Sequence, residues 1–305
     1  MTPQPALAAA PQAAAPQPAA NGIAEIAFPG GAARYATPNQ VTQWRVRTFF
    51  SKERDTLAWI ARFQPGETMV DIGANVGMYA IWAALTRGVK VVAFEPESQN
   101  YALLNANIFL NGLSEQISAY CLAISDRSGF DHFYLSRFEQ GGSCHAFGAP
   151  LNPDLQEMRP QFRQGCFAAK LDELVEAGVI PVPAHVKIDV DGLEHAVIDG
   201  MAGMLDRPEL KSVLVEVNGK LGEHTALVEG LIARGFHVDE RQKAASLQTE
   251  GFFAGSGNII FWRDADAATE LGADLAGESA GGPATVRSGG LRLAGLTPAE
   301  AVEAA

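Results

Sequence analysis

Short runs of apolar, often β-branched residues alternate along this chain with longer segments in which apolar residues recur every three or four positions. Runs of the first kind predict buried strands, and segments of the second kind predict helices that cover them. Repeated alternation of the two, from about residue 41 to residue 263, is typical of βαβ units built on a parallel sheet. We therefore expect one doubly wound α/β domain over residues 41–263.

The pattern assigns a type to most of this span. Expected strands lie at 68–72, 90–94, 117–124, 130–135, 185–190, 212–217, 236–242 and 257–263. Expected helices lie at 53–63, 77–87, 96–111, 193–205 and 223–234. Residues 137–165 are rich in Gly and Pro and weakly patterned, so we expect a loop there, and loops of that length tend to be functional.

Both ends of the chain depart from this pattern. Residues 1–20 consist mostly of Ala, Pro and Gln, a composition that buries too little large apolar surface to offset the entropy of ordering. Residues 264–305 are dominated by Ala and Gly and carry an excess of acids. The composition predicts a disordered Ala/Pro/Gln-rich arm over residues 1–24 and a flexible acidic Ala/Gly-rich tail over residues 264–305.

Charge and cysteine content narrow the class of protein. The formal net charge is −12, from 23 basic and 35 acidic residues, which opposes general attraction to nucleic-acid phosphates or anionic lipid. The three cysteines show no CxxC spacing and indicate neither a disulfide framework nor a zinc site. With no apolar run of 18 residues and no secretory signal pattern, we expect a cytoplasmic protein with no membrane partner and no nucleic-acid partner.

The first candidate for chemistry is the turn after the expected strand at 68–72, where Asp71, Gly73, Ala74, Asn75 and Gly77 lead into a helix. Glycines in such a turn bring backbone N–H groups close to a ligand. A dinucleotide-binding turn would read GxGxxG, whereas this one reads DxGxNxG. An acid in the turn would repel a diphosphate but suit the amino group of S-adenosylmethionine. The alternative is that Asp71 only caps the turn.

Two further strand ends carry groups suited to an adenosine. Glu95 and Pro96 directly follow the expected strand at 90–94, and an acid at this position can accept both ribose hydroxyls of an adenosine. The alternative for Glu95 is a helix N-terminal acid that interacts with the helix dipole. Ser125 and Asp126 follow the next strand and could contact an adenine amino group, although Ser-Asp-x-x-Gly is also an ordinary turn composition.

The expected strand at 185–190 carries charges where a buried strand should be apolar. Lys187, Asp189 and Asp191 alternate with apolar residues and so share one face, and Glu194 follows them. Buried charges are rarely kept without a partner or a task. We therefore regard these four residues as catalytic candidates, and Asp189 also as a cofactor-binding candidate, with an ion pair that seals the sheet as the alternative.

Taken together, these segments resemble the FkbM family of S-adenosylmethionine-dependent methyltransferases. The resemblance rests on Asp71–Gly77, Phe94-Glu95-Pro96, the helix with Asn105, Asn107 and Asn111, Ser125-Asp126, Lys170–Leu174 and Lys187–Glu194, in family order across residues 50–217. One departure is Asp191, where the family more often has Glu. The resemblance implies a Rossmann-like class I methyltransferase fold, with a mostly parallel seven-stranded sheet and helices on both faces. It also implies S-adenosyl-L-methionine as cofactor.

The function that this resemblance implies is O-methylation of a hydroxyl on a small metabolite or on a sugar or glycan. A nucleic-acid methyltransferase is one alternative, but adenine amino methylation generally uses an Asn/Asp-Pro-Pro-aromatic turn where this chain has Asp-Val-Asp-Gly at 189–192. A non-catalytic S-adenosylmethionine-binding scaffold is the other alternative. Neither the acceptor nor the oligomeric state can be identified from the sequence.

The remaining candidates are a histidine and a metal site. His145 lies in the long loop and could orient or deprotonate a hydroxyl. Asp189 or Asp191, with Glu216 and Asn218, offers the oxygen ligands that Mg²⁺ takes. Pairing of Lys187 with Asp189 would account for part of this charge without an ion. We therefore predict no metal ligand, and Mg²⁺ is not the favoured interpretation.

Overall fold

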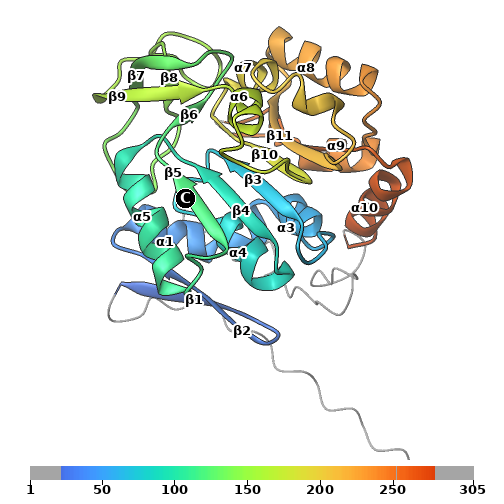
Figure 1. Cartoon of the computed structure of the whole chain (residues 1–305), viewed down its shortest axis with the longest axis horizontal. Helices are drawn as coiled ribbons and strands as arrows, with labels where there is room; N and C mark the ends of the chain where they lie inside the picture. The colour runs from blue at the N-terminus through green and yellow to red at the C-terminus, as the bar shows by residue number, and fades with distance from the viewer. Residues whose placement is uncertain (1–21, 252, 279–305) are drawn as a thin grey trace, which may run out of the picture.

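A six-stranded sheet forms the centre of the computed structural model, which describes residues 22–251 and 253–278 (Figure 1). Its strands are β3 (Thr68–Ile72), β4 (Lys90–Phe94), β5 (Ile117–Tyr120), β10 (His185–Ile188), β11 (Ser212–Asn218) and β12 (Ser256–Trp262). Their order is β12-β11-β10-β3-β4-β5, and only β12 runs antiparallel to its neighbour. The predicted α/β class and mostly parallel sheet are confirmed.

Helices cover both faces of this sheet, as predicted. One face packs against α3 (Arg54–Ile60), α4 (Met78–Arg87), α5 (Ser98–Leu110) and α10 (Ala265–Glu278). The other face packs against α6 (Leu171–Glu176), α7 (Glu194–Asp199) and α8 (Gly222–Ala233). Alternation along the strands separates the two cores: in β10, Val186 and Ile188 face the second core, while the intervening Lys187 faces the other side, over the ring of Tyr79.

The expected seventh strand is reduced to a single bridge, so the prediction of a strand at 236–242 is wrong. His237 pairs with Trp262 of β12 in antiparallel fashion, with N···O distances of 2.7 and 2.9 Å. Immediately afterwards, the carboxylate of Asp239 accepts hydrogen bonds from the N–H groups of Arg241 and Gln242 and caps α9 (Glu240–Ser246). The helix cap therefore ends the strand pairing, and the sheet has six strands within the described ranges.

A second, four-stranded sheet follows β5. It comprises β6 (Ala123–Ile124), β7 (Gly129–Leu135), β8 (Ala146–Phe147) and β9 (Phe162–Ala169), in the order β6-β9-β7-β8. The strand predicted at 117–124 is therefore split into β5 and β6, which lie in different sheets. The segment predicted as a loop at 137–165 contains β8 and the start of β9, because both strands pair with β7, one on each side of it.

The N-terminal part forms a hairpin that α5 holds in place. Its strands are β1 (Ile23–Phe28) and β2 (Gly31–Ala36). The Asn107 side chain accepts a hydrogen bond from the N–H of Ala36 at 2.7 Å, and Asn111 both accepts from and donates to the backbone of Arg34. The arm predicted over residues 1–24 is thus wrong at its end, where β1 begins; residues 1–21 lie outside the described part of the chain.

The C-terminal prediction also needs correction. Helix α10 occupies the first part of the tail predicted over residues 264–305, and its Ala268, Leu271 and Leu275 side chains are buried in the first core. Arg62 forms ion pairs with Glu270 and Asp274 of this helix, at 3.1 and 2.7 Å. Apolar residues at helical spacing outweigh the high Ala/Gly content in this stretch. Residues 279–305 lie outside the described part of the chain.

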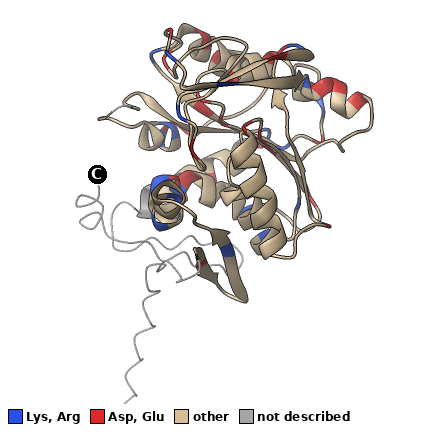
Figure 2. Ribbon diagram, turned by 90° about the vertical axis from the view of Figure 1, so that its left-hand side faces the viewer, with Lys and Arg blue, Asp and Glu red and all other residues tan. Residues whose placement is uncertain are grey.

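Two short helices connect the hairpin to the sheet, α1 (Gln40–Arg47) and α2 (Phe49–Lys52). The helix predicted at 193–205 is interrupted and consists of α7 followed by a 3₁₀ turn at Met204–Asp206. Figure 2 shows acidic and basic residues interspersed over the described ribbon. No helix among the described residues is both long and apolar enough to cross a membrane.

Candidate functional site

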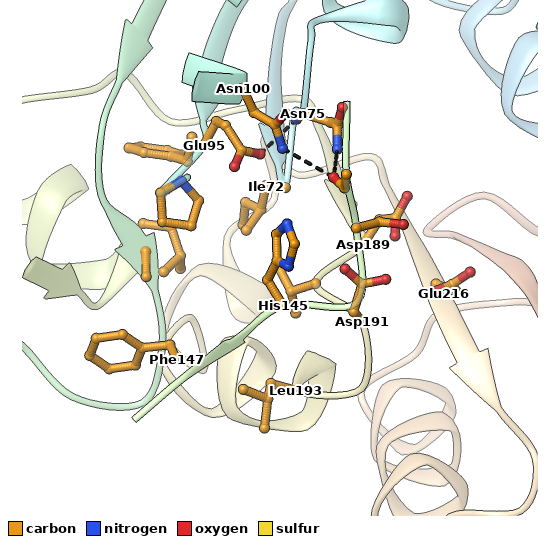
Figure 3. A pocket seen from close by; sticks show the side chains of 18 of the residues that line it. Ile72, Asn75, Glu95, Asn100, His145, Phe147, Asp189, Asp191, Leu193 and Glu216 are labelled. Atoms are coloured by element: carbon orange, nitrogen blue, oxygen red, sulfur yellow. Dashed lines mark hydrogen bonds between the residues drawn. The ribbon is translucent and has the colours of Figure 1, made fainter. Parts of the chain in front are cut away.

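A cavity opens at the carboxyl ends of β3, β4 and β10, the edge at which ligands bind in open α/β sheets (Figure 3). Its empty volume is about 1120 Å³, open solvent at its mouth included, which suffices for a nucleoside-sized ligand. The polar lining includes Asn75, Glu95, Ser125, His145, Asp189, Asp191 and Glu216. The apolar lining includes Ile72, Phe94, Leu122, Ile124, Phe133, Phe147 and Leu193.

The turn after β3 forms one wall of this cavity, and its sequence follows from close backbone packing. Gly73 has a φ of 79°, and a Cβ atom there would overlap the carbonyl oxygen of Asp189. Gly77 caps α4 with a φ of 85°, and a Cβ there would lie 2.5 Å from a methyl carbon of Leu104. Both positions require glycine. Of the four predicted turn residues, Gly73 and Asn75 line this cavity, Ala74 lines only a smaller cavity behind the turn, and Gly77 lines neither.

Glu95 is the acid that the structure places in the wall beside this turn. Its side chain is buried, and its two carboxylate oxygens accept hydrogen bonds from the backbone N–H groups of Asn75 and Glu97, at 2.8 and 2.9 Å. Burial raises the pKa of Glu95 to about 8, although both hydrogen bonds act in the opposite direction. Such an acid has a fixed orientation. A further hydroxyl donor that reaches it from the cavity would stabilise its charged form.

Asp71 occupies a different place from the one predicted. It is buried on β3, outside the cavity lining, and its Oδ1 lies 3.9 Å from Nζ of Lys187. Burial raises its pKa to about 6. Because the strand alternation turns this carboxylate into the core beneath the turn, the prediction that Asp71 itself contacts a cofactor is not supported by its position.

Next to Glu95, mostly apolar groups form a slot that also contains Pro96 and Ser125. The Ser125 hydroxyl donates to Asp126 at 3.2 Å. Asp126 itself is exposed and does not line the cavity. The predicted contact residues at this end are therefore reduced to Pro96 and Ser125.

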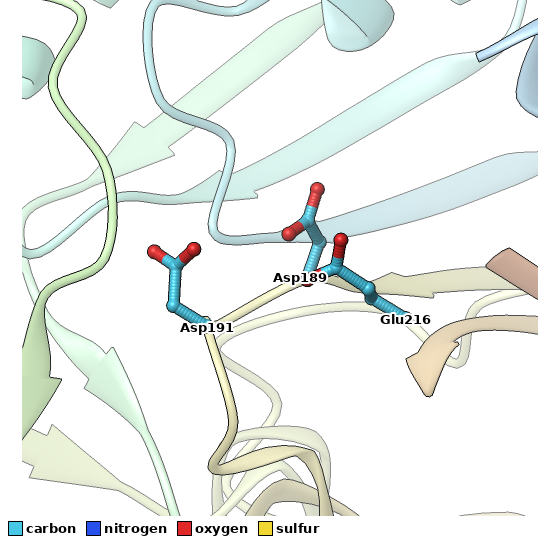
Figure 4. Close-up of side chains that lie close together, drawn as sticks. All are labelled: Asp189, Asp191 and Glu216. Carbon is cyan, nitrogen blue, oxygen red and sulfur yellow. The ribbon is translucent and has the colours of Figure 1, made fainter. Parts of the chain in front are cut away.

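Three carboxylates gather at the other end of the cavity (Figure 4). One oxygen from each of Asp189, Asp191 and Glu216 lies within 4.8 Å of the other two. Burial, with the charge of Asp189, raises the pKa of Asp191 to about 7 and that of Glu216 well above its usual range. Near neutral pH, this acidic trio therefore retains a proton.

Lys187 forms an ion pair with Asp189. Its Nζ lies 2.8 Å from Oδ2 of Asp189 and 5.4 Å from the ring centre of Tyr79. Burial alone would lower the pKa of Lys187, but Asp189 and Asp71 raise it above its ordinary value. Lys187 does not line the main cavity. The ion pair that the sequence analysis gave as the alternative to a catalytic role accounts for the position of Lys187.

The acidic trio is also the group of residues that could hold a divalent cation. All three side chains offer oxygen, the donor that Mg²⁺ prefers. Asn218, the fourth ligand considered from the sequence, is used elsewhere, because its Nδ2 donates to Asp154 at 2.8 Å and its Oδ1 accepts from the N–H of Lys220.

Glu194 is structural rather than catalytic in its placement. The side chain is fully buried and does not line the cavity. Its carboxylate accepts from the N–H groups of Val190 and Gly192, at 2.9 and 3.0 Å, and lies 3.2 Å from Nε2 of His224. These contacts shape the loop that positions Asp191, so the prediction of a direct catalytic role for Glu194 is not supported.

His145 lines the cavity, but its hydrogen bonds argue against a role as base. Its Nδ1 accepts from the N–H of Ser136 at 3.2 Å, so the neutral ring carries its hydrogen on Nε2. Burial lowers its pKa to about 4. The Nε2 atom is buried without a partner among the described residues. The ring is therefore arranged as a neutral hydrogen-bond donor.

Sequence reasoning missed the residues that hold the long loop over the turn. We call residues 139–145 the covering loop. The carbonyl of Gly142 accepts from the side-chain amides of Asn75 and Asn100, at 2.7 and 3.1 Å, and the N–H of Gly141 donates to Asn100 at 2.7 Å. Arg45 donates from Nε to the carbonyl of Gly141 at 2.8 Å. No local spacing joins residues so far apart in the chain.

Comparison with known proteins agrees with this arrangement. The chain is 27% identical over 253 residues to the 31-O-demethyl-FK506 methyltransferase FkbM of Streptomyces tacrolimicus, covering 75% of this chain and 94% of the relative. It is 26% identical over 196 residues to the hexuronic acid methyltransferase AglP of Haloferax volcanii, covering 64% of this chain and 74% of the relative.

Among solved structures, a methyltransferase FkbM from Methylobacillus flagellatus KT matches with a TM-score of 0.45 and 13% identity. The match covers 73% of this chain and about half, 52%, of the solved chain. A family model described as the methyltransferase FkbM domain matches residues 71–238, which span the turn, Glu95 and the acidic trio. The chain belongs to the FkbM methyltransferase domain family.

Proposed function

We propose that this methyltransferase uses S-adenosyl-L-methionine to methylate a hydroxyl oxygen on a small metabolite or on a sugar or glycan. The observation that carries the proposal is the position of Glu95: a buried carboxylate at the end of β4, beside the glycine turn and within the same cavity as the acidic trio. A fixed carboxylate there can accept both ribose hydroxyls of an adenosine.

The donor set of the cavity fits this cofactor. Next to Glu95, the apolar walls formed by Phe94, Leu122 and Ile124 suit an adenine ring. The carboxylates at the other end suit the positive charges of an ammonium and a sulfonium group. S-adenosylmethionine supplies a methyl group on a sulfonium, which is already a good leaving group. The protein therefore mainly has to align the acceptor and exclude water.

The acidic trio provides the proton chemistry in this proposal. An acceptor hydroxyl that gains a methyl group must lose its proton, and the carboxylate of Asp191 can take it. The pKa of Asp191, raised to about 7, is close to the value at which a base works best at neutral pH. The ion pair with Lys187 fixes the position of the Asp189 carboxylate in the cavity wall.

The names of the two relatives support the acceptor class: one acts on 31-O-demethyl-FK506 and the other on a hexuronic acid. Both acceptors are small molecules or sugars. The test is release of S-adenosylhomocysteine from S-adenosylmethionine in the presence of pooled sugars and polyketide-type alcohols. We expect turnover with at least one pool and a loss of roughly 10²-fold in kcat/KM for Asp191→Asn. Cofactor binding without turnover on any pool would instead favour the non-catalytic scaffold.

A further inference from the structure

A smaller side cavity adjoins the main one behind the glycine turn. Its empty volume is about 420 Å³, open solvent included. It shares Gly73, Asn75 and Asp189 with the main cavity, and helices α1 and α2 close it from the outside. Two cations, Arg45 and Lys52, line both cavities. These helices precede residues 71–238, so the family match does not include them.

Arg45 is held in place but not neutralised. Its Nε donates to the carbonyl of Gly141 at 2.8 Å, which fixes the plane of the guanidinium. Within residues 22–251 and 253–278, no carboxylate lies within 4.0 Å of Arg45. Its two terminal NH₂ groups make no other hydrogen bond with the described residues. A guanidinium with this geometry suits a carboxylate, which it can bind through two parallel hydrogen bonds.

Three basic side chains line the side cavity, Arg45, Lys52 and Lys187, against two carboxylates, Glu53 and Asp189. Lys52 pairs with Glu53 at 2.9 Å, and Glu53 raises the pKa of Lys52. Arg45 lies close enough for its charge to act in the opposite direction on Lys52, and its charge also helps to lower the pKa of His145. With Lys52 satisfied by Glu53, the positive charge of Arg45 remains available to a ligand.

We propose that Arg45 binds the methionine carboxylate of the cofactor in this side cavity, while Asp189 faces its amino group. This inference rests on the proposed function, because it assumes S-adenosylmethionine as the ligand. Asp189 lines both cavities and offers a carboxylate to an ammonium group, whereas Glu53, the other carboxylate in the lining of the side cavity, pairs with Lys52. It takes the role that the sequence suggested for Asp71.

The connectivity of the sulfonium supports this placement. Its sulfur has three substituents: the adenosyl group, the methyl group and the aminocarboxypropyl chain. If Glu95 holds the ribose and the acidic trio marks the acceptor, the third substituent needs a separate space that begins at the glycine turn. The side cavity is that space, since Gly73 and Asn75 line it together with the main cavity.

The experiment compares two ligands that differ only in the carboxylate. Titration calorimetry measures Kd for S-adenosylhomocysteine and for 5′-(3-aminopropylthio)-5′-deoxyadenosine, which lacks that group, with wild-type protein, Arg45→Gln, Arg45→Lys and Arg47→Gln. Arg47 is the matched control, because it is exposed on the same helix. We expect wild type and Arg47→Gln to prefer S-adenosylhomocysteine at least tenfold, and Arg45→Gln to lose most of that preference. Arg45→Lys should recover part of it.

The outcomes separate the possible roles of Arg45. An unchanged preference in Arg45→Gln overturns the proposal. Equal weakening of both ligands overturns it too, because it shows that Arg45 acts only through the covering loop. Unchanged binding of both ligands, with a raised KM for an anionic acceptor, would assign Arg45 to the acceptor instead. Failure of wild-type protein to bind either ligand would contradict the proposed function itself.

Discussion

The ammonium group of Lys187 lies 2.8 Å from a carboxylate oxygen of Asp189 and 3.9 Å from a carboxylate oxygen of Asp71. The two acids that contact this lysine differ in their surroundings. Asp189 is one-quarter exposed and faces the cavity, whereas Asp71 is buried behind it. Lys187 thus forms an ion pair with Asp189, which faces the cavity, and its own charge is stabilised by Asp71, which lies in the core.

Asp71→Asn should therefore change the stability of the fold more than it changes cofactor binding. Burial raises the pKa of Asp71 to about 6 despite the contact with Lys187, so its charge costs folding free energy at pH 8, and we expect Asn to raise the free energy of unfolding there by ~1–3 kcal/mol. The Kd for S-adenosylhomocysteine should change less than threefold. Urea denaturation and calorimetry on the same samples measure both quantities. Tenfold weaker binding at unchanged stability would show instead that Asp71 contacts the ligand.

Glu95→Gln should change cofactor binding more than it changes the stability of the fold. Gln replaces one of the two acceptor oxygens for the ribose hydroxyls with an NH₂ donor, so S-adenosylmethionine binding should weaken by ~1.5–3 kcal/mol, with the folded state retained. Asp126→Asn is the matched control, because Asp126 came from the same sequence argument but lies exposed outside the cavity. Its Kd should equal that of wild type. Equal Kd values for all three proteins would contradict the assignment of the ribose site.

The acidic trio should make stability depend on pH. Burial raises the pKa of Glu216 well above the value of about 4.5 expected for the unfolded chain. Above pH 4.5 the unfolded state therefore binds fewer protons than the folded state, and stability is lost as pH rises toward the folded pKa. Glu216→Gln should raise the free energy of unfolding by ~1 kcal/mol at pH 8 and by much less at pH 5.

Urea denaturation at the two pH values checks this prediction, with Glu229→Gln, an exposed acid on α8, as the control. The control should show no difference between pH 5 and pH 8. A larger gain for Glu216→Gln at pH 5 than at pH 8 would show that the direction of the shift is wrong.

Glu194→Gln should lower stability rather than catalysis. The variant weakens the hydrogen bonds to the loop at Val190 and Gly192 and the contact with His224, so we expect a loss of ~2–3 kcal/mol. Burial alone would lower the pKa of His224, but Glu194 raises it. That contribution is complete below the unfolded pKa of about 6.5 and is lost as pH rises through the folded pKa.

The destabilisation caused by Glu194→Gln should accordingly be larger at pH 6 than at pH 8. The value of kcat/KM, measured well below the melting temperature, should stay within about threefold of wild type, since the side chain does not reach the cavity. A drop of a hundredfold at unchanged stability would restore the catalytic role that the sequence suggested.

Methyl transfer should persist in EDTA. Lys187 already compensates Asp189, and Asp191 accepts a hydrogen bond from the N–H of Cys144 at 2.7 Å, so two members of the trio have partners without an ion. The rate after dialysis against EDTA, with and without added Mg²⁺, is the measurement. Activity that is lost with EDTA and restored by Mg²⁺ would assign the trio to a metal.

The sequence predicted the parts of this molecule that local patterns determine. Strands β3 and β4 begin and end where expected, because short apolar runs flanked by glycine or a helix start leave little choice. The turn at Gly73 was found from its residues, since a positive φ and a close approach to β10 both require glycine. Glu95 was found because an acid at a strand end is visible in the sequence.

What the sequence could not give depends on contacts between distant segments. The direction of the Asp71 side chain follows from which face of β3 is turned to the ligand, and alternation alone does not decide that. Arg45 and Asn100 reach the covering loop, which lies 96 and 41 residues away along the chain. Helix α10 forms because α3 and β12 offer its apolar side a surface.

The side chain of Gln242 has a consequence for the behaviour of the molecule in solution. Its side-chain amide donates a hydrogen bond to the carbonyl of Asn258 and accepts one from the N–H of Ile260. It thereby satisfies two backbone hydrogen-bonding groups on the outer edge of β12. An unpaired strand edge is a template onto which another chain can add and aggregate. One buried glutamine, on the helix that replaced a seventh strand, therefore protects this edge from aggregation.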